Sequence, residues 1–106
     1  MSIIYGVDTS EEVTPELVKE AIVVCFFEAH CEQSELNSSG DIESSYCSEL
    51  VKKAFTETGG DFHNPTKQSI IACIPWLVEF SKNFRDQTVI QKHMSQIMEL
   101  IGLMKE

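Results

Sequence analysis

The chain has 106 residues, of which 42% are hydrophobic, and a formal net charge of −9. This length and apolar content fit one domain that buries a core without disulfide or metal staples. Clustered Lys and Arg side chains make the phosphate contacts of proteins that bind nucleic acids or anionic membranes, so the acidic balance argues against both partners. Residues 1–50 have a net charge of −10 and residues 51–106 a net charge of +1. The acidic half could steer a basic partner, although we favour a solvated acidic face.

The cysteines show no CxxC pair and no regular spacing; they are Cys25, Cys31, Cys47 and Cys73. With no secretory signal ahead of them, we expect reduced thiols. The longest apolar run is far shorter than the ~20 residues that span a bilayer, and the N-terminus, MSIIYGVD, lacks a basic region. The sequence therefore predicts a cytoplasmic protein that does not engage a membrane.

Residues 1–13 begin with a short β-prone stretch that Gly6 and Asp8 interrupt; it contains Ile3, Ile4, Tyr5 and Val7. We expect a short extended N-terminal arm. The rest of the chain offers no sheet for this arm to join. It should therefore pack over a helix or pair with its counterpart in a homodimer.

The first helix is predicted over residues 15–33. Thr14 suits the N-cap and Pro15 the first helical position. The seven residues from Ala21 to Phe27 are all apolar, so at about 100° per residue they point in every direction around the axis. Val23 and Phe27 share a face with charged residues. They need cover from the arm, a second subunit or another helix, and both are predicted interface residues.

Three more helices are expected, at about residues 42–58, 65–84 and 87–104. Asp41, the Asn64-Pro65 pair and Asp86 mark their starts, and Gly59 suits the end of the second. Pro75 should kink or interrupt the third helix near Ile71. Trp76 beside it should be partly exposed and is the third predicted interface residue. Residues 1–106 are thus predicted to form a single all-α domain, a small antiparallel four-helix bundle with a proline-kinked third helix.

A candidate ligand site lies at the end of the first helix. Glu28 and Glu32 are one turn apart and continue the apolar face of that helix, where mutual repulsion and desolvation would raise at least one pKa. A divalent transition metal could be held by a mixed set of donors: Glu28, Glu32, Cys25, His30 and Cys31. The favoured alternative is that the helix outruns the bundle and both acids are solvated, because buried unpaired Glu is unfavourable.

Other signals of chemistry are weak. Cys25, Cys47 and Cys73 fall on the inward faces of three helices and could converge on a metal, although small buried thiols are common. No histidine follows a Glu by three residues, which argues against a di-iron carboxylate site. No hydrolase, nucleotide-binding or metalloprotease motif is present, so an enzyme is not expected.

The sequence favours a protein that acts through protein contacts, as a homodimer or as a subunit or adaptor of a larger assembly, without a cofactor. The alternative is a metal- or small-molecule-binding protein, possibly an enzyme, with its site at the end of the first helix near the kink.

Overall fold

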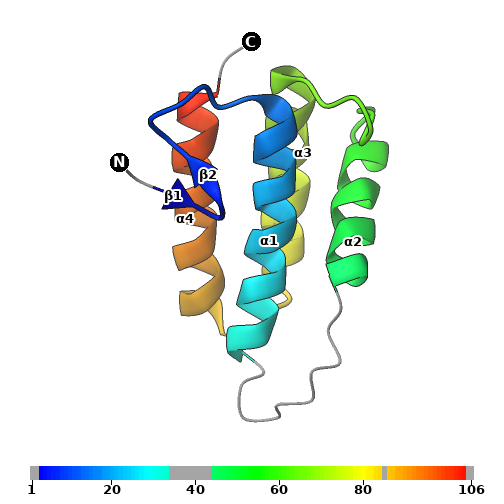
Figure 1. The fold of residues 1–106 in the computed structure, drawn as a ribbon. Coiled ribbons are helices and arrows are strands. Elements are labelled where there is room, and N and C mark those ends of the chain that lie inside the picture. Colours follow the sequence, from blue (N-terminus) through cyan, green and yellow to red (C-terminus); the bar gives the residue numbers. More distant parts are fainter. Residues whose placement is uncertain (1–2, 34–43, 85, 105–106) are drawn as a thin grey trace.

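In the part of the chain that the structure describes, four helices form a small antiparallel bundle, and in Figure 1 the chain runs down, up, down and up. The computed structural model describes residues 3–33, 44–84 and 86–104, without the side chains of residues 31–33 and 44–46. The helices are α1 (Pro15–Gln33), α2 (Ser44–Glu57), α3 (Lys67–Ser81) and α4 (Gln87–Leu103). The all-α fold class predicted from sequence is confirmed. No helix in the described part of the chain is long and apolar enough to cross a membrane.

The predicted cap residues explain several helix boundaries. The Thr14 hydroxyl accepts a hydrogen bond from the backbone N–H of Leu17 at 3.3 Å, and Asp86 accepts one from Val89 at 3.2 Å. Each bond satisfies an N–H that the first turn of a helix leaves without a partner. At the end of α2, Gly59 has a φ of +86°, the left-handed conformation that favours glycine.

The start of α3 differs from the prediction. The helix begins at Lys67, and its N-cap is Thr66, which forms a capping box with Ser69. Asn64, the residue predicted to cap it, instead donates to the Asp61 carboxylate at 3.1 Å. Pro75 lies inside α3, and the helix is continuous across it from Lys67 to Ser81, so the predicted interruption does not occur. Asp41, the predicted cap of the second helix, lies outside the described residues.

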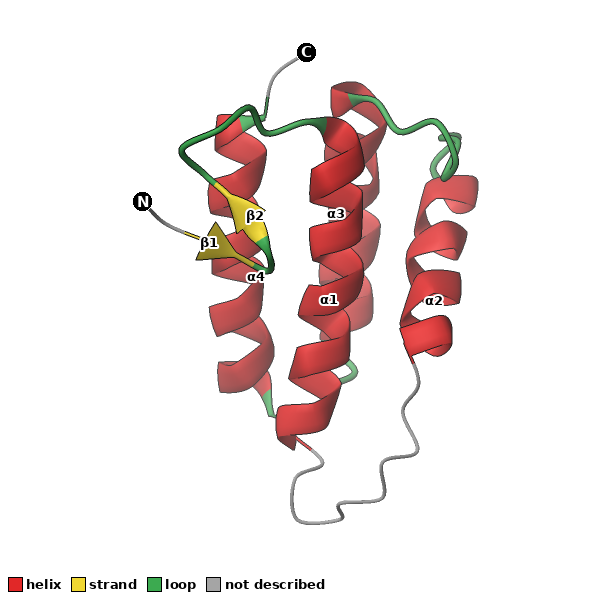
Figure 2. Cartoon of the chain, in the orientation of Figure 1, coloured by secondary structure: helices red, strands yellow, loops and turns green. Residues whose placement is uncertain are grey.

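The N-terminal arm is a two-stranded hairpin of β1 (Ile3–Ile4) and β2 (Val7–Asp8), shown in Figure 2. Ile4 pairs with Val7, which leaves Tyr5 and Gly6 as the turn. Their φ angles are +50° and +82°, as a type I′ turn requires, and this turn matches the twist of the two strands. The arm packs on its own chain, where β2 contacts α1 and Tyr5 contacts α4.

The core lies around α1, which packs against the three other helices and the hairpin. Its buried side chains include Val18, Ala21, Ile22, Val23, Cys25, Phe26 and Ala29, and they point to several sides of the axis. Phe26 packs against Phe80 and Phe84, with ring centroids 6.2 and 5.9 Å away. A parallel bridge between Val13 and Met104 joins the start of α1 to the end of α4. The apolar run of the first helix is therefore covered by its own chain.

Candidate functional site

The donors predicted at the end of α1 do not share one environment. Cys25 is fully buried, whereas Glu28 is exposed. Burial raises the pKa of the Cys25 thiol to about 12, against a smaller opposing effect of a hydrogen bond with Tyr5. A thiol of this kind stays protonated at neutral pH and is a poor metal ligand and nucleophile. The side chains of Cys31 and Glu32 lie outside the described residues.

His30, the remaining predicted donor, is half-buried and packs on an aromatic ring. Its ring centroid lies 4.5 Å from that of Phe84, with 35° between the planes. Burial lowers the pKa of His30 below its ordinary value, because it penalises the charged imidazolium. This contact and this shift fit a packing role at the seam between α1 and the α3–α4 connection.

The inward-facing cysteines do not form a centre. All three are buried free thiols: Cys25, Cys47 and Cys73. Cys47 lies near enough to Cys25 to add slightly to its raised pKa. Cys73 donates to the carbonyl oxygen of Ile70 within its own helix at 3.2 Å, and burial raises its pKa to about 12. Among the side chains that the structure describes, which exclude those of Cys31 and Glu32, no group of three from His, Cys, Asp and Glu could hold a metal ion.

Sequence reasoning missed a polar cluster under the hairpin. The Tyr5 hydroxyl and Nδ1 of His93 form a hydrogen bond, and the two rings lie 5.7 Å apart. Tyr5 also reaches Cys25, so one side chain of the turn contacts both α1 and α4. The Tyr5-Gly6 pair between β-prone residues was a signal for a hairpin. Nothing in the sequence indicated that His93, 88 residues away, would be its partner.

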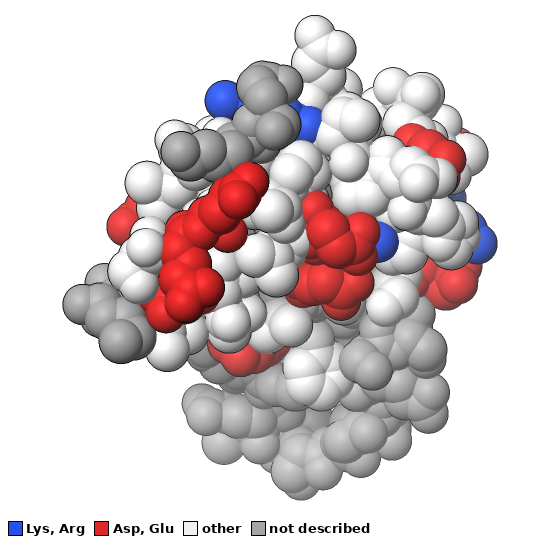
Figure 3. Space-filling view, turned by 45° about the horizontal axis from the view of Figure 1, so that its top comes forward, with Lys and Arg blue, Asp and Glu red and all other residues white. Residues whose placement is uncertain are grey.

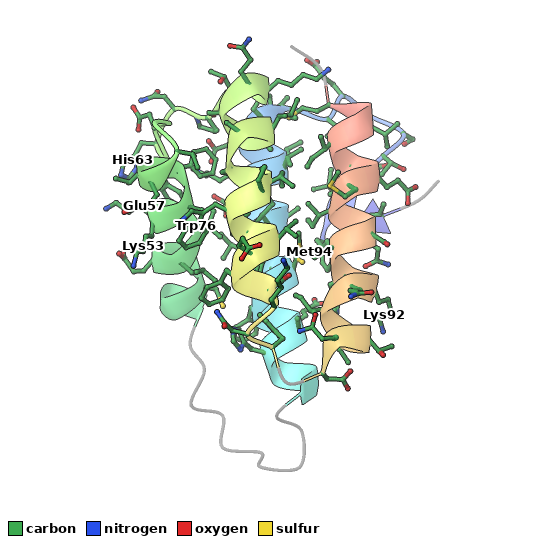
Figure 4. All side chains as sticks on the ribbon, turned by 180° about the vertical axis from the view of Figure 1, so that it is seen from behind. Lys53, Glu57, His63, Trp76, Lys92 and Met94 are labelled. Carbon is green, nitrogen blue, oxygen red and sulfur yellow. The ribbon has the colours of Figure 1, made fainter. Side chains whose placement is uncertain are left out.

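An open groove lies between α2 and α3. It has a volume of about 320 Å³ and is lined by Glu49, Leu50, Lys53, Trp76 and Phe80. The rings of Trp76 and Phe80 are 3° from parallel, with centroids 6.0 Å apart, so they form an aromatic wall. Figure 4 shows Trp76 between the two helices, with Lys53 on α2. Of the three predicted interface residues, Trp76 is the one that lines a surface groove.

The other flank of α3 is apolar and exposed. Ile71 is 49% exposed and Val78 is 42% exposed. They are seven residues, or about two helical turns, apart, so they project on the same side of the helix. Pro75, between them in sequence, is also exposed. On α4, Met94 lies between α3 and α4 (Figure 4), and Met98, one turn further on, is 50% exposed.

Several patches of acidic side chains lie on the face of the molecule shown in Figure 3, which includes the end where α1 begins. Exposed acids of this region include Glu11, Glu12, Glu16 and Glu20. Lys19, the one base in residues 1–50, is 5% exposed. Its ammonium donates to the carbonyl oxygen of Phe62 at 2.9 Å, lies 4.4 Å from the centroid of that ring, and pairs with Glu16 at 3.0 Å. Lys19 thus fixes α1 to the α2–α3 loop and offsets part of the charge of the neighbouring Glu16.

No family model, no curated protein and no solved structure matches this chain. The functional proposal below therefore depends on the geometry of the molecule alone.

Proposed function

We propose that this protein acts through protein–protein contacts, as a homodimer or as a small subunit or adaptor of a larger assembly, and that the outer face of α3 makes the contact. The supporting observation is the pair of exposed apolar side chains Ile71 and Val78, aligned on one side of α3. Contiguous exposed apolar surface in a small domain often marks an interaction site. Met98, 50% exposed on the neighbouring helix α4, adds a further apolar side chain to the surface.

This assignment moves the interface from α1 to α3. Val23, a predicted interface residue, is 8% exposed, and Phe27 is half-buried and packs against the core. Lys19 and His30, which project on the same side of α1 as Val23, contact Phe62 and Phe84 of the same chain. A second subunit is therefore not needed to cover that side of α1.

The charge distribution favours contact through α3 rather than elsewhere. Two copies that each carry a charge of −9 repel one another, so a dimer should bring together sides that lack the acids. The outer face of α3 belongs to the half of the chain with a net charge of +1. Its acid Glu79 is paired with Lys82 at 2.8 Å. An apolar contact between these faces therefore adds little repulsion.

The proposed compartment rests on the buried thiols, and the proposed class of partner rests on the net charge. Buried free thiols such as Cys25, Cys47 and Cys73 fit a reducing environment, which supports the cytoplasm. The acidic surface supports a protein partner over a nucleic acid. The metal-binding alternative has no group of donors to support it among the described side chains, so we do not propose it.

Light scattering coupled to size exclusion tests the homodimer across a series of protein concentrations. The protomer mass is 12.0 kDa, and the wild-type mass should rise toward twice this value. Raised salt should strengthen the dimer, because salt screens the repulsion between acidic copies while the apolar contact persists. A contact held by ion pairs would weaken instead.

The variant Ile71→Ser/Val78→Ser should remain a monomer at every concentration. Leu17→Ser is the matched control, because Leu17 is an apolar residue of α1 that is 39% exposed; it should dimerise like the wild type. A wild-type protein that stays monomeric at millimolar concentration in raised salt would contradict the homodimer. A dimer that survives the double substitution would place the contact elsewhere.

A further inference from the structure

The groove between α2 and α3 has the chemistry of a second, separate contact site. Its floor and wall are apolar, from Leu50 and the parallel rings of Trp76 and Phe80. Its rim is charged, with Glu49 and Lys53 on the exposed side of α2. We propose that this groove binds an amphipathic helix of a partner protein, one that inserts an apolar anchor side chain and carries one basic and one acidic residue a turn apart.

The size and shape of the groove select this kind of occupant. At about 320 Å³, it lies at the lower end of the range for small-molecule sites, about 300–1,000 Å³. This volume has room for one or two large apolar side chains. Its lining residues span about one turn of α2, from Glu49 to Lys53, and one turn of α3, from Trp76 to Phe80. A partner helix laid on this open groove can place an anchor side chain in it and keep its polar flank at the charged rim.

The rim charges select the polar flank of the partner. Glu49 and Lys53 are one turn apart on α2, a spacing at which the two side chains can pair. They form no ion pair with each other or with any other side chain that the structure describes. Both side chains are exposed, so their charges can reach a partner. A base opposite Glu49 and an acid opposite Lys53 would complement them, whereas two like charges would leave one repulsive contact.

The site is distinct from the proposed dimer face. Trp76 follows Ile71 by five residues, which places the two side chains about 140° apart around α3 at about 100° per residue. One flank of α3 can thus meet a second copy while the other holds a partner helix. The inference rests on the proposed function only in taking protein contacts as the mode of action. If the experiment on one site gives a negative result, the experiment on the other site still tests its own proposal.

Trp76 is the single tryptophan of the chain, so its fluorescence reports directly on the groove. The probe is a synthetic helical peptide without Trp or Tyr, with an apolar stripe and one Lys and one Glu four residues apart. Titrated into the full-length protein at low salt, it should shift the emission of Trp76. An unchanged emission up to millimolar peptide would overturn the proposal. A shift that protein concentration alone produces would also overturn it, since a second copy would then occupy the groove.

Charge variants then test the rim. Lys53→Glu should weaken peptide binding about fivefold, since the change replaces an attraction at the exposed rim with a repulsion. Lys52→Glu is the matched control, because it makes the same charge change at the exposed neighbouring residue that does not line the groove. It should alter the affinity less than about twofold.

The double exchange Glu49→Lys/Lys53→Glu restores one charge of each sign. It should recover most of the wild-type affinity, because the peptide can lie along the groove in either direction. Equal losses in Lys53→Glu and Lys52→Glu would show a general effect of net charge and contradict a charge-selective rim. Failure of the double exchange to recover binding would contradict it as well.

Discussion

Helices α1 and α3 are both rich in apolar residues, yet α3 leaves more apolar surface exposed, at Ile71 and Val78, than α1 does at Leu17. α1 has seven consecutive apolar residues and is enclosed by three helices and the hairpin. α3 also contacts the other three helices, but no hairpin lies on its outer side, and Ile71 and Val78 remain exposed. The apolar content of a helix therefore does not show whether it is available to a partner. Its position among the other elements decides this.

The hairpin accounts for much of the difference. Tyr5 at its turn hydrogen-bonds His93 of α4 and reaches Cys25 of α1. The short arm thereby closes the seam between these two helices (Figure 1). Residues 3–8 thus cover part of α1, whereas a second subunit could cover the outer face of α3.

The largest expected effect is a difference in stability between substituting a buried residue of α1 and substituting an exposed residue of α3. Phe26→Ala should lower the free energy of unfolding by about 3–5 kcal/mol, because it removes a fully buried ring that packs against Phe80 and Phe84. Ile71→Ala should change it by about 0.5 kcal/mol or less at concentrations where the protein is a monomer. Urea denaturation measures both values. Similar losses would contradict the distinction between α1 and α3.

A second test concerns how α3 is held against α2. Gly60→Ala would place its Cβ 3.0 Å from Cβ of Ser69 and 3.2 Å from a ring carbon of Phe55. This crowding should cost about 1–3 kcal/mol of stability. Gly102→Ala, in α4, meets nothing within 4 Å and should stabilise the protein by about 0.5–1 kcal/mol. A neutral Gly60→Ala in the same thermal or urea measurement would show that the loop can move away from α3.

Tyr5→Phe tests the cover over α1 and α4. The change keeps the ring but removes the hydroxyl that bonds His93, so the expected loss is about 0.5–1.5 kcal/mol. Amide hydrogen exchange should increase at the hairpin and at the adjoining parts of α1 and α4, and should not change in α2. A uniform increase over all four helices would contradict a local role of the hairpin.

The smallest effect is a pH dependence from His30. Burial lowers its folded-state pKa, so the unfolded chain takes up a proton first as the pH falls. Stability from this group is thus fully present above the unfolded-state pKa of about 6.5 and is lost as the pH falls through the lower folded-state value. His30→Phe should flatten stability measured between pH 7.5 and 5.5. An equally steep dependence in the variant would assign it to another group.

Much of the fold was predictable because local chemistry determines it. The caps at Thr14 and Asp86 act within one turn of the chain, and Gly59 ends α2 through its own backbone conformation. The predicted start of α3 was wrong, because Asn64 and Thr66 are both residue types that cap helices well. The Thr66–Ser69 capping box, which sequence reasoning overlooked, holds the start two residues further on.

The candidate site was less predictable because it depends on contacts between distant residues. The helical period places Val23 on the side of Lys19 and His30, but it could not show that Phe62 and Phe84, in the loops that flank α3, contact that side. Lys19 reaches Phe62 across 43 residues, and Tyr5 reaches His93 across 88. The prediction that Trp76 is partly exposed is confirmed, because its angular position on α3 sets it off the centre of the apolar stripe.

Methyl NMR with a soluble paramagnetic reagent tests the contrast between α1 and α3 most directly. In dilute protein, the reagent should broaden the methyl signals of Ile71 and Val78 and leave those of Ile22 and Val23 unaffected. At high concentration, the signals of Ile71 and Val78 should become protected, while those of α1 do not change. Broadening of Val23 in dilute protein would contradict the enclosure of α1. Ile71 and Val78 signals that stay equally accessible at every concentration would contradict self-association through α3.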